Sequence, residues 1–333
     1  MEKNIDIVIP WVDGSDKAWL EEKNKFSEQI NSTVYGHNYR EWGLLKYWFR
    51  GIEENAPWVR NIYFVTWGHI PDWLNTNNDK LKIVKHEDYI PGEYLPTFSA
   101  NTIELNFHRI EGLSEKFVYF NDDMYLINKT TVEDFFKNGK PCDSAIINPI
   151  APANNNCIAH MQLTNAAIIN QHFKKKKVMR ENLFGWFNLK YGSLNLLNLM
   201  FSPWGRFPGL LEKHLPSSLL KETYETLWRE EKEVLDNTCK HKFRDFKVDV
   251  NQWLLKEWQI CSGNFEPRSN RFGIFVSIYN IDDAKKTAKI IQGNKYKTLC
   301  VNDQLDGSGI DEIMDPVINA FENRFPKKCS FEK

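Results

Sequence analysis

Residues 5–16, Ile5-Asp6-Ile7-Val8-Ile9-Pro10-Trp11-Val12-Asp13-Gly14-Ser15-Asp16, join a short apolar run to an acidic turn. A β-branched run of this length that ends at proline and glycine is typical of a strand buried in a parallel sheet. Asp13 and Asp16 follow the run directly. In open α/β sheets, ligands bind outside the carboxyl ends of the strands. This segment therefore predicts both the fold class and the edge of the sheet at which a site would form.

The same pattern recurs through the first 150 residues. Strands are predicted at 61–67, 81–85 and 117–120, and helices at 41–55 and 101–110. Strands that alternate with helices indicate a layered α/β domain with a largely parallel sheet.

The alternation stops near residue 150 and returns near the end of the chain. Helices are predicted at 218–235, 250–259 and 282–293, and a strand at 298–301. We expect three parts: an α/β core over 1–150, a mainly helical insertion or lobe over 151–280, and a C-terminal segment over 281–333 that completes the first sheet.

Composition excludes several classes of protein. The 43 Lys and Arg residues nearly balance the 44 Asp and Glu residues, so no global charge favours nucleic acid or an acidic membrane. A chain that is 26% charged and 42% hydrophobic is typical of a globular protein. No apolar run is long enough to span a membrane, and the first residues lack the apolar stretch of a signal peptide. Six scattered cysteines without a C-x-x-C pair argue against structural zinc and for reduced thiols.

Acidic residues follow three predicted strands: Asp13 and Asp16 the first, Asp122 and Asp123 the fourth, and Asp303 and Asp306 the last. If these strands are neighbours, the carboxylates converge on one pocket suited to Mg²⁺ or Mn²⁺, which prefer oxygen ligands. The alternative is that they are ordinary turn residues at strand ends. Three clusters at equivalent places make the two interpretations about equally strong.

Two basic features have a structural and a functional interpretation. On the helix 101–110, Asn101, Glu104 and His108 share one face beside Arg109, which suits either a phosphate site or a solvent-facing side; the residues alone favour the second. The run 174–177 of four lysines favours a solvated surface, and the alternative is a patch that rests on anionic lipid headgroups. P-loop, G-x-G-x-x-G and G-x-S-x-G motifs are absent from the sequence, which leaves kinase, dinucleotide and serine-hydrolase functions without their usual support.

Several long segments, in order along the chain, resemble the Stealth family of hexose-1-phosphate transferases of capsular and cell-wall polysaccharides. This family is similar to the catalytic subunit of the animal enzyme that begins the mannose-6-phosphate tag. The resemblance is strongest over 5–126 and again from about 296. The segments that carry it are 5–16, 56–66, 70–75, 95–99, 103–104, 108–114, 117–123, 298–303 and 321–328. In the middle of the chain, His214-Leu215-Pro216 matches the family's His-x-Pro element, and His241-Lys242-Phe243-Arg244 lies at about the right distance for its basic element.

The resemblance implies a Rossmann-like, nucleotide-sugar-transferase type of layered sheet and a specific reaction. A sugar-1-phosphate passes from a UDP-sugar to a hydroxyl of a glycan acceptor, which forms a phosphodiester and releases UMP. Such catalysis depends mostly on positioning and on charge neutralisation by cations. The implied metal is Mg²⁺ or Mn²⁺.

The resemblance also implies roles for individual residues. Asp123 is the first candidate for the general base and His214 the second, because histidine suits the role by its pKa but the aspartate belongs to the better-supported motif. The candidate sets are catalytic Asp122, Asp123, His214 and Arg244; substrate-binding Trp11, Asp13, Gly14, Asp16, Arg50, Ser99, His108, Arg109 and Asn121; and metal-binding Asp122, Asn302 and Asp303.

Two alternatives stay open. A metal-dependent glycosyltransferase would use the same donor but release UDP, and a non-catalytic glycan-binding protein would turn over no UDP-sugar. In either enzyme the partners are a UDP-sugar and a glycan, with no nucleic acid. Acceptors of this class include lipid-linked repeats, so we expect a cytoplasmic protein that makes transient peripheral contact with the inner face of the membrane.

Overall fold

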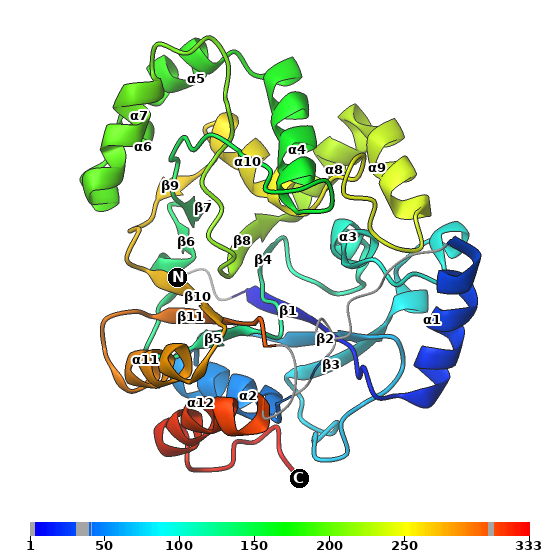
Figure 1. Ribbon diagram of the computed structural model, residues 1–333. Helices are drawn as coiled ribbons and strands as arrows, with labels where there is room; N and C mark the ends of the chain where they lie inside the picture. Colours follow the sequence, from blue (N-terminus) through cyan, green and yellow to red (C-terminus); the bar gives the residue numbers. More distant parts are fainter. Residues whose placement is uncertain (1–3, 31–39, 41, 306–309) are drawn as a thin grey trace.

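The computed structural model describes residues 4–30, 40, 42–305 and 310–333, and its fold is of the layered α/β class that the sequence predicts (Figure 1). The largest sheet contains β1 (Ile5–Trp11), β2 (Ile62–Thr66), β3 (Leu81–Lys85), β4 (Lys116–Tyr119) and β8 (Ser217–Leu220). Their order across the sheet is β3-β2-β1-β4-β8. The first four run parallel, and β8 is antiparallel to β4. The strands expected at 5–9, 61–67, 81–85 and 117–120 are confirmed.

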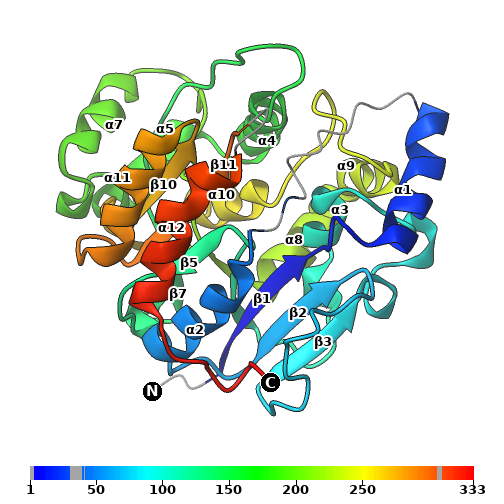
Figure 2. The same cartoon turned by 60° about the horizontal axis from the view of Figure 1, so that its bottom comes forward.

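Side-chain alternation along β1 builds a core on each face of this sheet. Ile7 and Ile9 belong to a buried cluster with Trp48 of α2 (Leu45–Asn55) and Phe321 of α12 (Ile310–Arg324). Val8 points the other way, into a second cluster that contains side chains of α8 (Lys221–Glu230) and α10 (Trp253–Cys261). Helices α2 and α12 lie next to each other on their side of the molecule (Figures 1 and 2). Burial of both faces is why the strand has apolar residues at adjacent positions.

The C-terminal segment does not extend the large sheet, contrary to the expectation from sequence. Strand β11 (Thr298–Asp303) pairs in parallel with β10 (Gly273–Ile278) and antiparallel with β5 (Met124–Leu126), forming a separate three-stranded sheet. The large sheet has no place for it beside β4, because β8 pairs with that edge. Side chains of β11 nevertheless enter the same buried cluster as Ile7 and Ile9. The last strand thus joins the core through packing and through β5, which follows β4 directly.

The middle of the chain is rich in helices, which lie above the large sheet in Figure 1. They are α4 (Ala159–His172), α5 (Lys175–Glu181), α6 (Leu183–Trp186), α7 (Asn195–Phe201) and α9 (Lys232–Lys240), together with α8 and α10. A small sheet of β6 (Phe136–Lys137), β7 (Lys140–Asp143) and β9 (Glu266–Pro267) lies beside them. The remaining elements are α1 (Lys17–Ile30), α3 (Ala100–Leu105), α11 (Ile281–Gln292) and the short 3₁₀ helices His86–Asp88, Gly92–Tyr94, Phe107–Arg109, Val132–Asp134 and Leu189–Leu194. None of the helices in the described ranges is long and apolar enough to span a membrane.

Two predicted helices differ from the structure. The helix expected at 218–235 begins instead as strand β8 and then divides into α8 and α9 at Glu231, because the residues that begin it pair with β4. The helix expected at 101–110 ends at Leu105, and a 3₁₀ turn follows. The side-chain amide of Asn106 donates to the carbonyl of Thr102 at 2.8 Å, occupying an acceptor that a continuing helix would use.

Candidate active site

The loops that follow β1 and β2 meet at the carboxyl edge of the large sheet. The backbone N–H of Asp13 donates to Nε2 of His69 at 2.8 Å, and the His69 ring lies edge-on to Trp11 at 5.3 Å. The Asp13 carboxylate accepts from the N–H and the hydroxyl of Ser15 at 2.8 and 2.6 Å. Burial opposes the charged form of Asp13, but the Ser15 hydrogen bonds and His69 lower its pKa. Asp16 accepts from the N–H of Trp19 at 2.9 Å, which caps α1.

The sequence did not identify His69 as a residue of the site, although its side chain accepts a hydrogen bond from the backbone of this loop. Because its Nε2 accepts the Asp13 N–H, the ring must be neutral, with its proton on Nδ1, which lies 3.7 Å from Asp16. Burial lowers the pKa of His69, and the nearby aspartates oppose that shift only in part. The signal in the sequence was its position, just after the second strand.

A cleft of about 630 Å³ opens beside this loop, a volume typical of small-molecule sites. Trp11, Asp13 and Gly14, which the sequence analysis assigned to the donor, lie on its wall. The structure adds Arg40 and Lys46, two cations that the sequence analysis did not assign to the site. A cleft with both acidic and basic walls can hold a diphosphate together with its counter-ions.

A second group of residues forms where β4 leads into β5. Asp123 Oδ2 lies 3.4 Å from Nε2 of His214, and the Cys300 thiol donates to the same oxygen at 3.3 Å. Asp123 Oδ1 is buried and has no hydrogen-bond partner among the described residues. The backbone N–H of Val301 donates to the Asp123 carbonyl at 2.9 Å, which ties the aspartate to β11. We call Asp123, His214 and Cys300 the Asp123 cluster.

His214 is held in an unusual conformation with its charge stabilised. Its φ is +46°, a left-handed value that is uncommon for a residue other than glycine. Burial would lower the pKa of His214, but Asp123 and Glu104 outweigh that effect and raise it. Glu104, one of the three residues assigned to a polar helix face, is buried and accepts from the Tyr119 hydroxyl at 2.7 Å. That face therefore points into the protein rather than to solvent.

Arg244 lies near this cluster and is exposed. Its positive charge lowers the pKa values of both Glu104 and His214, opposing the shifts that raise them. Its guanidinium has no hydrogen-bond or ion-pair partner within the described part of the chain, so it is available to an anionic ligand.

Ser99 is completely buried, and its hydroxyl also lacks a partner among the described residues. Asn121 and Asp122 lie in the turn between β4 and β5.

Asp303 connects the cleft to β11. Its Oδ2 accepts from Arg40 at 2.8 Å and from the Trp42 indole at 3.0 Å, and its Oδ1 accepts from the N–H of Leu305 at 2.8 Å. Neighbouring Asn302 contacts Ser277 and Gln304 through its side chain. Asp306, the second acidic residue of this predicted cluster, lies outside the described residues.

The Asp123 cluster is a candidate cation site, and its donor set can be tested against the expected metal. In the described ranges, Asp123, His214 and Cys300 are the one group of three His, Cys, Asp or Glu side chains whose ligand atoms all lie within 4.8 Å of one another. The unpartnered Asp123 oxygen fits Mg²⁺. The sulfur does not, because burial and Asp123 raise the pKa of Cys300 well above its usual value and keep it a thiol. The oxygen ligands for a hard cation must therefore come from Asp123 and the acidic residues near it.

Three residues that the family resemblance assigned to substrate binding, Arg50, His108 and Arg109, make contacts within the protein instead. Arg50 donates to both carboxylate oxygens of Glu332 at 2.6 and 2.7 Å and to the carbonyl of Phe325 at 2.8 Å. His108 stacks on Tyr224 at 5.2 Å, and the Arg109 guanidinium lies 5.0 Å from the centre of the Trp228 ring. These contacts join helices and the C-terminus, and we leave the three residues out of the proposed site.

The packing of His108 predicts acid sensitivity. Burial, with help from Arg109 and Lys221, lowers the pKa of His108 to about 3 from the ordinary 6.5. Between these two pH values, His108 is protonated in the unfolded chain but stays neutral in the folded chain. Above pH 6.5 neutral His108 therefore costs the folded state no stability, and the free energy of unfolding falls as the pH drops below 6.5. Between about pH 7.5 and about pH 5, His108 should cost about 2 kcal/mol of unfolding free energy. Urea titrations should show that His108→Phe, which keeps the stacking, loses that much less stability on acidification. Equal losses in both proteins would contradict the interpretation.

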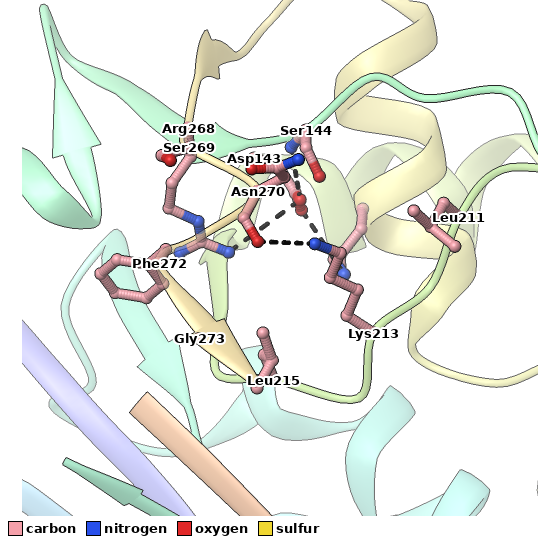
Figure 3. A pocket seen from close by; sticks show the side chains of 11 residues that line it. Asp143, Ser144, Leu211, Lys213, Leu215, Arg268, Ser269, Asn270, Phe272 and Gly273 are labelled. Atoms are coloured by element: carbon pink, nitrogen blue, oxygen red, sulfur yellow. Dashed lines mark hydrogen bonds and ion pairs between the residues drawn. The ribbon is translucent and has the colours of Figure 1, made fainter. Parts of the chain in front are cut away.

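A buried charge network lies on the N-terminal side of His214, and Figure 3 shows the part of it around Asp143 and Lys213. Lys213 donates to the carbonyl of Asn270 at 2.7 Å. Glu212 accepts from Lys256 at 2.6 Å, and Lys256 lies 3.5 Å from Asp143. Burial raises the pKa of Glu212 to about 7, although Lys256 opposes the shift. Asp143, Lys213 and Lys256 line a small pocket of about 20 Å³, room for about one water molecule. These contacts hold Glu212 and Lys213, the two residues that precede His214.

Comparison with known proteins gives a consistent result. Residues 3–30 match Stealth protein conserved region 1, and residues 38–143 match Stealth protein conserved region 2. The chain is 42% identical to the capsular polysaccharide phosphotransferase WcwK of Streptococcus pneumoniae, over 99% of this chain and 98% of that protein. It is 38% identical to the exopolysaccharide phosphotransferase cps2G of Lactiplantibacillus plantarum, over 99% and 96%. It is also 40% identical to the receptor polysaccharide phosphotransferase WefC of Streptococcus gordonii, over the full length of both.

Among solved structures, the galactosyltransferase LgtC aligns over 96% of this chain and 95% of its own. Its identity is 9% and its TM-score is 0.40, a likeness too distant to support a functional conclusion. The two conserved regions and the full-length relatives do support one. The chain belongs to the Stealth family.

Proposed function

We propose that this protein is a polysaccharide phosphotransferase that moves a sugar-1-phosphate from a UDP-sugar to a hydroxyl of a glycan acceptor. The product is a phosphodiester, and the leaving nucleotide is UMP. The names of the full-length relatives support phosphotransfer in polysaccharide synthesis. The observation that carries the proposal is the pairing of His214 with Asp123 at the edge of the sheet where the loop of Trp11, Asp13 and Gly14 borders a cleft.

In the proposed reaction, the acceptor oxygen attacks the phosphorus that carries the sugar. The bond from that phosphorus to the bridging oxygen breaks, and UMP leaves with the electron pair. His214 accepts the proton of the acceptor hydroxyl, because histidine is the side chain whose ordinary pKa lies near neutrality, which suits a general base. Asp123 orients the imidazole and stabilises its charged form. This assignment reverses the order expected from sequence, where Asp123 came first, because Asp123 Oδ2 already contacts both His214 and Cys300.

The donor loop of Trp11, Asp13, Gly14 and Asp16 would hold the nucleotide in the cleft. Arg244 would clamp a phosphate oxygen, for which a free guanidinium is well suited. Asn121 completes the proposed substrate contacts, and Ser99 is left out because it is completely buried.

We infer that Asp122, Asn302 and Asp303, with the unpartnered oxygen of Asp123, would hold Mg²⁺ or Mn²⁺. A bound divalent cation would neutralise the charge of the diphosphate. Asp303 is paired with Arg40, so Asp303 would have to give up this partner to hold a cation, and Arg40 would then be available to the phosphates. The donor set is oxygen-rich once the thiol is excluded, as Mg²⁺ prefers.

The nucleotide product tests the reaction. Incubating the protein with a UDP-sugar, Mg²⁺ and an acceptor glycan should release UMP in proportion to the phosphodiester formed, as measured by anion-exchange chromatography. A glycosyltransferase would release UDP, and UDP as the sole product would overturn the proposal. Asp303→Ala should abolish UMP release. If no UDP-sugar were turned over and Asp303→Ala still bound glycan, the protein would instead be a glycan-binding module.

A further inference from the structure

A cluster of exposed apolar side chains lies on the segment from α6 to just beyond α7. Seven of the 14 large hydrophobic side chains that are exposed in the described chain lie between residues 183 and 204. Leu189 is 97% exposed and Phe184 is 83% exposed. We call this set the apolar tip; its members are Leu183, Phe184, Leu189, Leu196, Leu199, Met200 and Trp204. An exposed apolar group of this size on a globular protein marks an interaction site.

The protein holds these side chains outward through buried contacts on the opposite side of the same segment. Trp186, Tyr191 and Asn198 are completely buried. The Asn198 amide donates to the carbonyls of Ala145 and Trp186 at 2.8 and 2.6 Å, and its oxygen accepts from the N–H of Ile147 at 2.7 Å. The tip is therefore a formed surface with a definite orientation. It lies on the opposite side of the molecule from α1 (Figures 1 and 2).

Lys175, one of the four lysines of the run 174–177, stabilises the fold. Lys175 is buried, and its ammonium donates to the carbonyls of Phe201, Ser202 and Trp204, which lie at the C-terminal end of α7. A lysine there satisfies carbonyls that the helix leaves unpaired. The contact joins the start of α5 to the end of α7, so the other lysines of the run are held beside the apolar tip.

Charge separates this region from the rest of the protein. Residues 174–206 contain seven Lys or Arg and one acidic residue, Glu181, for a net charge of +6. The whole chain carries −1, so the other 300 residues carry −7. Six of the seven cations are exposed: Lys174, Lys176, Lys177, Arg180, Lys190 and Arg206.

We propose that the apolar tip and these exposed cations form a docking surface for an anionic lipid bilayer. Leucine, phenylalanine and tryptophan inserted at the headgroup boundary, with lysine and arginine around them, are the pattern of peripheral membrane binding. A protein partner fits less well, because lysine is depleted at protein–protein interfaces. Side chains as exposed as Leu189 and Phe184 protrude from the surface and suit insertion into lipid. The inference concerns binding alone and does not depend on the reaction proposed above.

Vesicle co-sedimentation with the full chain tests this surface. The protein should pellet with vesicles of phosphatidylcholine and phosphatidylglycerol, less with phosphatidylcholine alone, and less at high salt. Phe184→Ser with Leu189→Ser should weaken binding to the anionic vesicles at least about tenfold, because both side chains leave water on insertion. Lys176→Glu with Lys177→Glu should weaken it by at least about tenfold through lost attraction.

Matched controls carry the same changes elsewhere. Val248→Ser with Tyr279→Ser removes exposed apolar groups outside the tip, and Lys285→Glu with Lys289→Glu reverses exposed charges on α11; both should bind as the native protein does. Unchanged thermal melting should show that the tip variants are folded. The proposal is overturned if the native protein fails to bind the anionic vesicles, or if the tip variants bind them equally well. It is also overturned if the tip mediates self-association in place of lipid binding, seen by ultracentrifugation as a native dimer that Phe184→Ser with Leu189→Ser dissociates.

Discussion

His214→Ala is expected to lower the rate of UMP release by about 10²- to 10⁴-fold, the range by which a positioned general base accelerates proton transfer. The loss should fall on kcat rather than on KM, because the proton moves in the transition state and the donor cleft is unchanged. Anion-exchange measurement of UMP under saturating UDP-sugar would give the rate. His172→Ala is the matched control, since His172 pairs with Glu231 on the surface at 2.5 Å and is not part of the proposed site.

His214→Ala distinguishes the two candidate bases, because Asp123→Asn is expected to impair the enzyme in either case. If His214 takes the proton, His214→Ala should release UMP far more slowly than the native protein at every pH. Asp123→Asn should also lower the rate, because it removes the negative charge beside His214. If Asp123 were the base, His214→Ala would keep more than about a tenth of the native rate, whereas Asp123→Asn would lose nearly all of it. That second result would refute the assignment made here.

Lys256→Met is expected to destabilise the fold by about 3–5 kcal/mol, the usual cost of removing one partner from a buried ion pair. Lys256 is buried with Glu212 at 2.6 Å and Asp143 at 3.5 Å. The variant leaves both carboxyl groups without their ammonium. Glu212, whose pKa is already raised to about 7 by burial, can relieve part of the cost by taking a proton. The loss should therefore be larger at pH 8 than at pH 6, as measured by urea unfolding.

Two further variants test the cause. Lys256→Met combined with Glu212→Gln should recover part of the stability, because the charged partner is then also removed. Lys240→Met is the matched control, since Lys240 is an exposed lysine paired with Asp236 at 2.5 Å, and solvent screens surface pairs of this kind so that they add little to stability. Equal destabilisation by Lys256→Met and Lys240→Met would show that the buried network does not hold this region.

Local patterns along the chain were enough to predict the strands and the acidic turns. Strand β1 is recognisable because adjacent apolar residues are needed where both faces of a strand are buried. Asp13 and Asp123 were recognisable because each follows such a strand. The same local patterns failed at Ser217–Leu220, where pairing with β4 overrode an apparent helical period. They also failed at 101–110, where the Asn106 side chain ended the helix early.

Contacts between distant parts of the chain decided which candidates meet. Asp123 and Cys300 are 177 residues apart, and Arg40 and Asp303 are 263 apart; neither pair has a local signature. Arg50, which family resemblance had placed near the substrate, pairs instead with Glu332, 282 residues away.

The sequence by itself determined the fold class, the parallel strands and the acidic residues at their carboxyl ends, because these depend on periodicity and turn chemistry within a few residues. Tertiary structure alone decided that β11 lies beside β5, that His214 faces Asp123, and that Lys175 is buried while its neighbours surround an exposed apolar tip. The physical reason is that burial and pairing depend on which distant segments pack together. The residues next to a given position do not show which distant segment will pack against it.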